Sequence, residues 1–123
     1  GAKEIIQAYY DLSLIHFQNG EMIEGMDFFK KAVKEAEAFE NEFYMKLLNV
    51  LKALFIDTAN RQNVKNALYG LKTEKGYPYF EELALVAAEF YTKKRRMEDS
   101  IYFYNEMVCA QRQIQRSDSH YEI

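Results

Sequence analysis

Apolar residues recur at intervals of three and four along most of the chain, which is the spacing of amphipathic α-helices. The first stripe ends at Asn19-Gly20, where glycine can take the left-handed conformation that closes a helix. It comprises Ile5, Ala8, Tyr9, Leu12 and Ile15. A second helix is predicted from about Met22 to Phe39, with an inner face of Met26, Phe29, Ala32, Val33 and Ala36. The two helices predict a hairpin.

Two further helices are predicted in the middle of the chain. The third runs from about Asn41 to Ile56 with Tyr44, Leu47, Leu48, Leu51, Leu54 and Phe55 at helical spacing. The residues 57–60, Asp-Thr-Ala-Asn, break it. The fourth, from Gln62 to Glu74, is weaker because its helical stripe is interrupted by the poor helix formers Asn63, Asn66 and Gly70. That stripe is Val64, Ala67, Leu68 and Leu71.

Lys75-Gly76-Tyr77-Pro78 separates the fourth helix from the fifth, since proline disfavours helical angles in the residue before it. The fifth helix is predicted from Tyr79 or Phe80 to about Lys94, with Leu83, Ala84, Ala87, Ala88 and Tyr91 facing inward. The sixth is predicted from about Met97 to beyond Ile114, using Ile101, Tyr104, Met107, Val108 and Ile114. No segment sustains the alternation of a strand, so the predicted fold is all-α.

Two of the hairpins carry the same residue offsets. One has Leu12-Ser13-x-x-His16, then Gly20, Gly25, Phe29 and Ala32; the other has Ala87-Ala88-x-x-Tyr91, then Arg95, Ser100, Tyr104 and Met107. These are the offsets of the tetratricopeptide pattern, in which small residues let two antiparallel helices approach. We therefore expect one domain, 1–123, of three hairpins stacked as a right-handed α-solenoid, with repeats at 6–39, 44–77 and 81–114 and a tail at 115–123.

The first helix of each tetratricopeptide hairpin lines a concave groove. With Ser13, Leu51 and Ala88 as the small-residue positions, the predicted lining is Gln7, Tyr10, Leu14 and Phe17, then Met45, Leu48, Lys52 and Phe55, then Glu82, Leu85, Glu89 and Thr92. Aromatic, aliphatic and polar groups mixed in this way suit an extended peptide. The alternative is an ordinary inner wall without a ligand.

Composition and charge exclude some classes of partner rather than identify one. The net charge is −3, and the one dense basic run, residues 93–96, falls at a helix end where cations complement the helix dipole, so nucleic acid is not an expected partner. One cysteine and the lack of any long apolar run predict a reducing, cytoplasmic setting with no membrane contact. Gly1-Ala2 precedes a helical pattern already under way, which indicates a truncated chain.

No residue pattern predicts catalysis, a metal or a cofactor. The two histidines share no metal-binding spacing with each other or with Cys109. His16 stands where the repeat usually has Tyr, and is interpreted as a packed core histidine rather than a base or pH sensor. Cys109 lies beside Val108 and Ala110 and is read as a buried, inert thiol rather than a nucleophile.

Four parts of the chain share a further pattern. They are Gln7-Ala8-Tyr9-Tyr10 with Ile15-His16-Phe17; Leu51-Lys52-Ala53-Leu54-Phe55; Tyr79-Phe80-Glu81-Glu82-Leu83-Ala84 with Ala87-Ala88-Glu89-Phe90-Tyr91; and the tail Gln113-Ile114-Gln115-Arg116 to Tyr121-Glu122-Ile123. In these segments the chain resembles the C-terminal region of the Rap-type response-regulator aspartate phosphatases of Bacillus. Asn63, Gly70 and residues 117–120 depart from the family pattern.

This resemblance implies a quorum-sensing regulator, of sporulation or competence, whose repeats take up short signalling peptides. It implies that the response regulator binds an N-terminal helical bundle absent here, so that the fragment is not an enzyme although its parent promotes aspartyl-phosphate hydrolysis. Two alternatives stay open: a generic tetratricopeptide scaffold for another protein, and the repeat domain of a peptide-sensing transcription factor. The uncovered apolar face of the first helix further predicts self-association.

Overall fold

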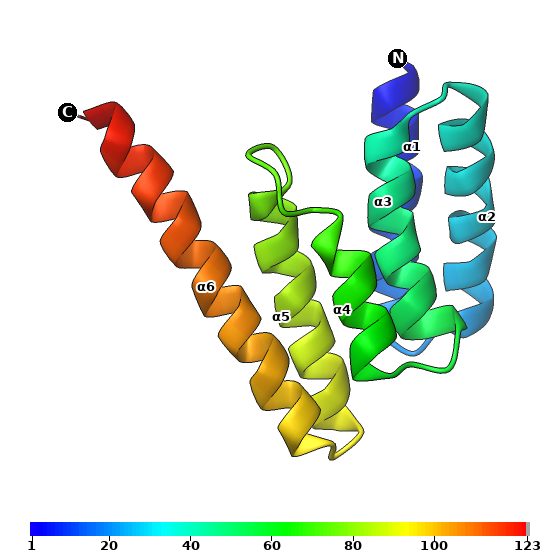
Figure 1. Ribbon diagram of the computed structural model, residues 1–123. Coiled ribbons are helices and arrows are strands. Elements are labelled where there is room, and N and C mark those ends of the chain that lie inside the picture. The colour runs from blue at the N-terminus through cyan, green and yellow to red at the C-terminus, as the bar shows by residue number, and fades with distance from the viewer. Residues whose placement is uncertain (123) are drawn as a thin grey trace. The chain divides into compact units, whose positions relative to one another are not determined.

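The computed structural model describes the backbone of residues 1–122 and the side chains of residues 1–117. Within this part of the chain the structure is all-α, as predicted, and has no strand (Figure 1). The α-helices are α1 (Ala2–Gln18), α2 (Met22–Ala38), α3 (Glu42–Leu51), α4 (Arg61–Tyr69), α5 (Tyr77–Lys93) and α6 (Met97–Glu122), and a π-helical turn, η1 (Lys52–Ile56), continues α3. Residues 118–123 of the predicted tail lie outside the described side chains.

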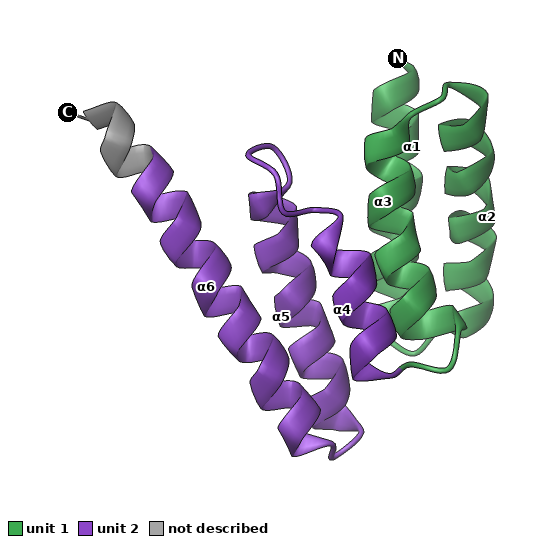
Figure 2. Ribbon diagram, in the orientation of Figure 1, with its two compact units in different colours: residues 1–59 green, residues 60–123 purple. Residues whose placement is uncertain are grey.

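The chain divides into two compact units, residues 1–59 and 60–123 (Figure 2). Unit 1 holds α1, α2, α3 and η1, and unit 2 holds α4, α5 and α6. The boundary therefore falls inside the predicted second repeat, 44–77, whose two helices belong to different units. The division of the chain into three repeats of one domain stays a prediction.

Three helices end in the same backbone motif. After α1, the N–H of Glu21 donates to the carbonyl of His16 and that of Gly20 to Phe17. The same pair of bonds closes α2 at residues 40 and 41, and α5 at residues 95 and 96. The motif requires a left-handed residue just past the helix end, which is supplied by Gly20 (φ 76°), Glu40 (φ 51°) and Arg95 (φ 59°). The chain thus turns sharply enough for each following helix to run back antiparallel.

In unit 1, α1 and α2 pack at the small residues that the repeat pattern predicts. The hydroxyl of Ser13 donates to the carbonyl of Gly25 at 3.0 Å, and both residues are buried. A Cβ on Gly25 would lie 2.5 Å from the ring of Phe17, so only glycine fits this crossing without movement. The core around it contains Ile6, Phe29, Ala32, Ala36, Leu47 and Leu51.

In unit 2, the rings of Tyr91 and Phe103 stack at 5.6 Å between α5 and α6. The hydroxyls of Thr92 and Ser100 lie 2.6 Å apart at the same crossing, where the repeat pattern places small residues. The buried side of α5 is the predicted one, Leu83, Ala84, Ala87, Ala88 and Tyr91, and α4 contributes Val64 and Leu68.

The predicted face of α6 is wrong. Ile101, Tyr104 and Val108 are exposed, and the helix instead buries Asp99, Ser100, Phe103 and Ala110. The physical reason is that α6 carries apolar residues on two sides, and the polar residues Asp99 and Ser100 are satisfied by partners on α4 and α5 that periodicity alone does not reveal.

Two predicted helix boundaries also need correction. The fourth helix ends at Tyr69 rather than Glu74, because residues 70–76 form tight turns closed by Thr73, whose hydroxyl accepts the N–H of Gly76. The fifth begins at Tyr77 rather than Tyr79 or Phe80, because Pro78 lies inside the first turn, where no intrahelical N–H bond is lost.

Candidate functional site

The first and third helices, both predicted to line the groove, lie side by side in unit 1 (Figure 1). The rings of Tyr10 and Tyr44 meet edge to face at 6.0 Å, and those of Phe17 and Phe55 stack at 5.1 Å. From the first ring pair to the second, the residue numbers increase along both helices, so the two helices are parallel. This arrangement places side chains of both helices on a common surface.

Four of the predicted groove residues are not on that surface. Tyr10, Leu14, Phe17 and Leu48 are buried, each with at most 5% of its area accessible. Their contacts explain why: the aromatic rings fill the space between neighbouring helices, and Phe17 also packs against Phe29. The prediction that these four present themselves to a ligand is corrected accordingly, since they form the packed layer beneath the surface.

The remaining predicted residues of unit 1 are accessible to solvent. Gln7 and Lys52 are exposed, and Met45 and Phe55 are partly exposed. Lys52 forms an ion pair with Asp57, with its Nζ 3.1 Å from the carboxylate. We refer to the surface carrying Gln7, Met45, Lys52 and the two residues described next as the α1–α3 face.

Sequence reasoning missed Asp11 and Asn49, which are exposed and follow Gln7 and Met45 by one helical turn. Residues four apart lie on the same side of a helix, so both belong to the α1–α3 face. Partial burial raises the pKa of the Asp11 carboxyl above its usual value. The signal was available in the spacing, because each follows a predicted lining residue by four positions.

The π-helical turn Lys52–Ile56 was not predicted, and it positions two of the predicted site residues. It closes with the N–H of Asp57 donating to the carbonyl of Lys52 at 2.8 Å, five residues back. A π turn rotates the residues after it relative to a regular helix, and such turns often occur at functional sites. Here it lets Phe55 stack on Phe17 while Lys52 stays at the surface.

In unit 2, the predicted groove residues Glu82, Leu85 and Glu89 lie on the side of α5 opposite its buried stripe. Glu82 and Glu89 are exposed, and Leu85 is partly exposed. The fourth predicted residue, Thr92, is exposed, but its hydroxyl donates to the carbonyl of Ala88 and lies at the crossing with α6. Glu82, Leu85 and Glu89 form an acidic counterpart to the α1–α3 face within the second unit.

The two side chains considered for chemistry lie at the surface rather than in the core. The His16 ring stacks on Phe28 at 5.5 Å, and its Nδ1 is 3.3 Å from a carboxylate oxygen of Glu21. The ring is packed but only half-buried, so the prediction of a core histidine is corrected. Cys109 is exposed, which corrects the prediction of a buried thiol. Among the described residues no three His, Cys, Asp or Glu side chains gather as a metal site would require.

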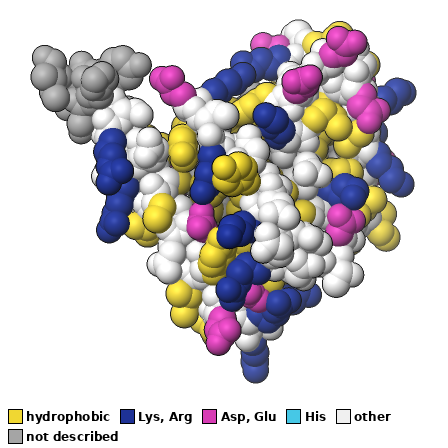
Figure 3. All heavy atoms as spheres, in the orientation of Figure 1, with side chains coloured by type: hydrophobic (Ala, Val, Ile, Leu, Met, Phe, Trp, Pro, Cys, Tyr) yellow, Lys and Arg dark blue, Asp and Glu magenta, His cyan; other side chains and the backbone are white. Residues whose placement is uncertain are grey.

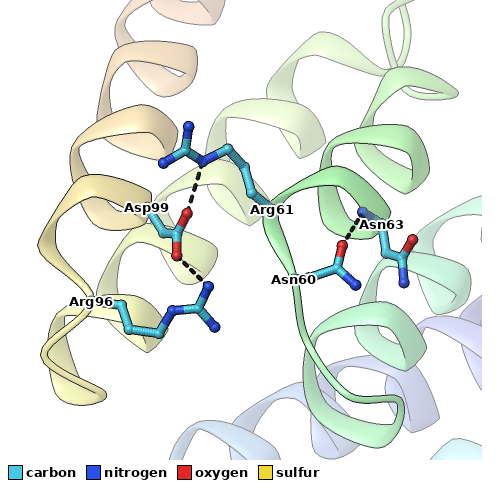
Figure 4. A network of polar contacts seen from close by, with 5 residues as sticks. All are labelled: Asn60, Arg61, Asn63, Arg96 and Asp99. Carbon is cyan, nitrogen blue, oxygen red and sulfur yellow. Dashed lines mark hydrogen bonds and ion pairs between the residues drawn. The ribbon is translucent and has the colours of Figure 1, made fainter.

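A polar network fixes the start of α4 to the turn between α5 and α6 (Figure 4). The carboxylate of Asp99, only 11% exposed, lies 2.7 Å from Nε of Arg61 and 2.6 Å from a guanidinium nitrogen of Arg96. Asn60 caps α4 by accepting the N–H of Asn63. With Arg61 also lying over the ring of Tyr102, this network is a structural clamp.

Comparison with known proteins finds relatives in Bacillus subtilis. The chain is 39% identical over 117 residues to response regulator aspartate phosphatase E of Bacillus subtilis (strain 168), an alignment that covers 95% of this chain and 31% of the relative. It is 32% identical to response regulator aspartate phosphatase A and 28% identical to regulatory protein RapC of the same organism, covering 30% and 25% of their lengths. The chain thus spans about a third of these relatives or less.

No protein-family model matches the chain, and no solved structure is a significant match. In the part of the chain that the structure describes, none of the helices combines the length and apolar character that crossing a membrane demands.

Proposed function

Starting from its homology to the response regulator aspartate phosphatases of Bacillus, we propose that this chain is the part of such a regulator that receives a short signalling peptide. In this proposal the chain works in the cytoplasm and binds the peptide in an extended form. In the same proposal, phosphatase action on a response regulator requires regions that correspond to the parts of the relatives outside the alignment. The chain alone is then expected to leave a phosphorylated receiver domain unchanged.

The observation that carries this proposal is the composition of the α1–α3 face. Gln7 and Asn49 offer amide groups that both donate and accept, as a peptide backbone requires. Asp11 and Lys52 supply one charge of each sign, and Met45 supplies an adaptable apolar contact. Beneath them the stacked rings of Phe17 and Phe55 keep the surface rigid, which lowers the entropic cost of ordering a ligand.

The α5 residues Glu82, Leu85 and Glu89 form a second set of accessible polar and apolar groups, which we assign to the same function within unit 2. Their two carboxylates favour a peptide that carries at least one Lys or Arg. Asp11 adds to this preference, because a partly desolvated carboxylate gains most from a cationic partner.

Isothermal titration calorimetry of the chain with a panel of synthetic penta- and hexapeptides, each with and without one lysine, tests the proposal. Saturable binding of lysine-containing peptides is expected. Asp11→Asn should weaken it about tenfold, in line with the loss of one charge-assisted hydrogen bond, and Gln7→Ala should weaken it less, since a neutral hydrogen bond contributes about 0.5–1.5 kcal/mol. Lys34→Ala, an exposed cation of α2, serves as the matched control and should change nothing. A panel without any saturable binding would refute peptide reception by this chain.

A scaffold that binds a folded protein is the second candidate, because unit 1 also exposes an apolar stripe. Ile5, Ala8, Leu12 and Ile15 follow one side of α1 at intervals of three and four, and Ile15 is 52% exposed. If the chain is such a scaffold, Lys52→Ala, Glu82→Ala and Glu89→Ala leave partner binding unchanged. Removing the α2 charges Lys30 and Lys31 then weakens it.

The stripe also supports the proposal that the chain associates with itself through α1. Sedimentation of the wild-type chain across a hundredfold concentration range should show a growing fraction of dimer, and Ile15→Lys should abolish it. Ile23→Lys, on α2 and outside the stripe, is the matched control, since Ile23 is 84% exposed. A strict monomer at every concentration would contradict association through this face.

A further inference from the structure

Unit 2 contains a cleft that the proposed function does not use. The C-terminal half of α6 diverges from the start of α5 in Figure 1, and a cavity of about 260 Å³ lies between them and the segment that leads into α5. It is lined by Lys72, Tyr77, Phe80, Glu106, Cys109, Ala110, Arg112, Gln113 and Arg116. A cavity of about 150 Å³ already accommodates benzene, so this one has room for a substituted ring.

The charge of this cleft is opposite to that of the whole molecule. Three cations, Lys72, Arg112 and Arg116, face one carboxylate, Glu106, whereas the chain as a whole carries −3. The Nζ of Lys72 lies 3.9 Å from the Glu106 carboxylate, which compensates one of the positive charges. Two positive charges are left on the cleft wall.

Arg112 and Arg116 are exposed and one helical turn apart, an arrangement in which like charges repel. Neither arginine is drawn into the ion pair that Glu106 makes with Lys72. An anion placed between the two guanidinium groups would relieve the repulsion and could accept paired hydrogen bonds from them. Gln113 adds an amide donor on the same wall.

The floor of the cleft is apolar. Phe80 and Ala110 are each 2% exposed, and the rings of Tyr77 and Phe80 lie 6.3 Å apart. The Lys72 ammonium sits 5.5 Å from the centre of the Phe80 ring, so the cationic and aromatic parts of the site adjoin each other. Along α6, Figure 3 shows hydrophobic and basic side chains next to one another. A ligand filling the cleft needs a flat apolar body as well as a negative group.

From these observations we propose that the cleft binds a small organic anion, namely a flat apolar group that carries a carboxylate or a phosphate. The apolar body contacts Phe80, Tyr77 and Ala110, and the anionic head lies between Arg112 and Arg116. This site is built entirely from unit 2 residues outside the predicted groove. Binding of an anion in this cleft therefore does not depend on whether the chain binds a peptide.

Nuclear magnetic resonance titration of the ¹⁵N-labelled chain at constant ionic strength tests this site with benzoate and phenyl phosphate as probes. Either probe should produce saturable shifts confined to amides at 72–80 and 106–116, and the tighter of the two identifies the preferred head group. Neutral benzamide and inorganic phosphate, which lack the charge or the ring, should bind at least about tenfold more weakly. Raising the salt concentration should weaken the two organic anions.

Cys109 provides a second readout because it is the only thiol in the chain and lies on the cleft wall. Bound benzoate or phenyl phosphate should slow its alkylation by iodoacetamide with the same concentration dependence as the amide shifts. Alkylation that is unaffected at saturating probe would place the ligand elsewhere and overturn the assignment.

Paired variants separate this site from general charge attraction. Arg112→Gln with Arg116→Gln should weaken binding at least tenfold without changing the circular dichroism spectrum, since both side chains are exposed. Lys30→Gln with Lys34→Gln removes an equally spaced, exposed pair of cations from α2 and should have no effect. The proposal is overturned if neither organic anion saturates, if benzamide binds equally well, or if the two double variants behave alike.

Discussion

At Gly25, one close contact reverses the usual effect of replacing a helical glycine by alanine. Glycine in a helix normally costs about 0.5–1 kcal/mol relative to alanine, so Gly→Ala usually stabilises. Here the new methyl group would lie 2.5 Å from the ring of Phe17, which is itself held between Phe29 and Phe55. These two rings restrict the directions in which the Phe17 ring can move.

We therefore predict that Gly25→Ala lowers the free energy of unfolding by about 1–3 kcal/mol, the usual cost of overpacking. Urea denaturation followed by circular dichroism measures it. In a Phe17→Leu background the same substitution should cost much less, because the clashing ring is gone. An equal cost in both backgrounds would mean that Phe17 is not the obstacle.

The buried phenol of Tyr91 should make the free energy of unfolding depend on pH. Its ring is fully buried, and no described protein group lies within hydrogen-bonding distance of its hydroxyl. Burial, with a smaller effect of Asp99, raises the pKa of this phenol, while Arg96 and Arg61 act in the opposite direction. The folded chain thus keeps the proton at a pH where the unfolded chain releases it. This contribution is complete below about pH 10 and is lost as the pH rises further.

Tyr91→Phe should remove that part of the alkaline loss while leaving stability at pH 7 within about 1 kcal/mol of wild type, since no hydrogen bond is broken. Urea midpoints at pH 7 and pH 10.5 measure the effect, with the exposed Tyr104→Phe as control. If both variants lose stability with pH as steeply as wild type, the alkaline sensitivity originates elsewhere.

At the scale of elements, the three matching helix ends differ in one respect: the left-handed residue is glycine after α1 but Glu40 after α2 and Arg95 after α5. A side chain at such angles costs about 1–2 kcal/mol, whereas glycine adopts them freely but loses more entropy on folding. Glu40→Gly and Arg95→Gly should therefore each raise the free energy of unfolding by about 0.5–1 kcal/mol.

Thermal and urea denaturation of each variant test this, and Glu37→Gly, inside the last turn of α2, is the control that should destabilise. Destabilisation by Glu40→Gly comparable to that of the control would show that Glu40 contributes contacts worth more than its backbone strain.

The same elements show how far the sequence could predict this fold. Helix positions and the turn at Gly20 follow from local preferences, which the sequence displays directly. The π turn after α3 could not be predicted, because its bond from Asp57 to Lys52 uses residue types that suit an ordinary helix equally well. For α6 the pattern offered two apolar sides, and the choice between them was made by Asp99 and Ser100, which are paired with residues distant in sequence.

For the candidate site, the sequence could predict which helices lie next to each other but not which of their side chains are buried. Counting from Ser13 predicted that the first and third helices share one face, and α1 and α3 do lie side by side. It did not distinguish the rings that fill the space between the helices, Tyr10 and Phe17, from the neighbours that reach solvent, Asp11 and Asn49. Position on the helix sets direction, but the size of the neighbouring side chains decides burial.

At the scale of the whole molecule, each compact unit has a core of its own, so we predict that damage to one unit is felt mainly there. Asp99 is suited to this test because its carboxylate joins Arg61 and Arg96 within unit 2 and is mostly buried. Asp99→Asn removes the charge and leaves two arginines facing a neutral amide. Both arginine side chains are partly exposed, so solvent reduces the loss to about 1–2 kcal/mol.

Hydrogen exchange followed by mass spectrometry measures where this loss appears. Exchange in residues 60–117 should accelerate by about five- to thirtyfold, since 1.4 kcal/mol corresponds to a factor of ten in an opening equilibrium, while residues 1–59 change little. Glu98→Gln, the exposed neighbour on the same turn of α6, should leave both regions unchanged. Equal acceleration in both regions would mean that the two cores open as one cooperative block, and the clamp at Asp99 would then govern the stability of the entire chain.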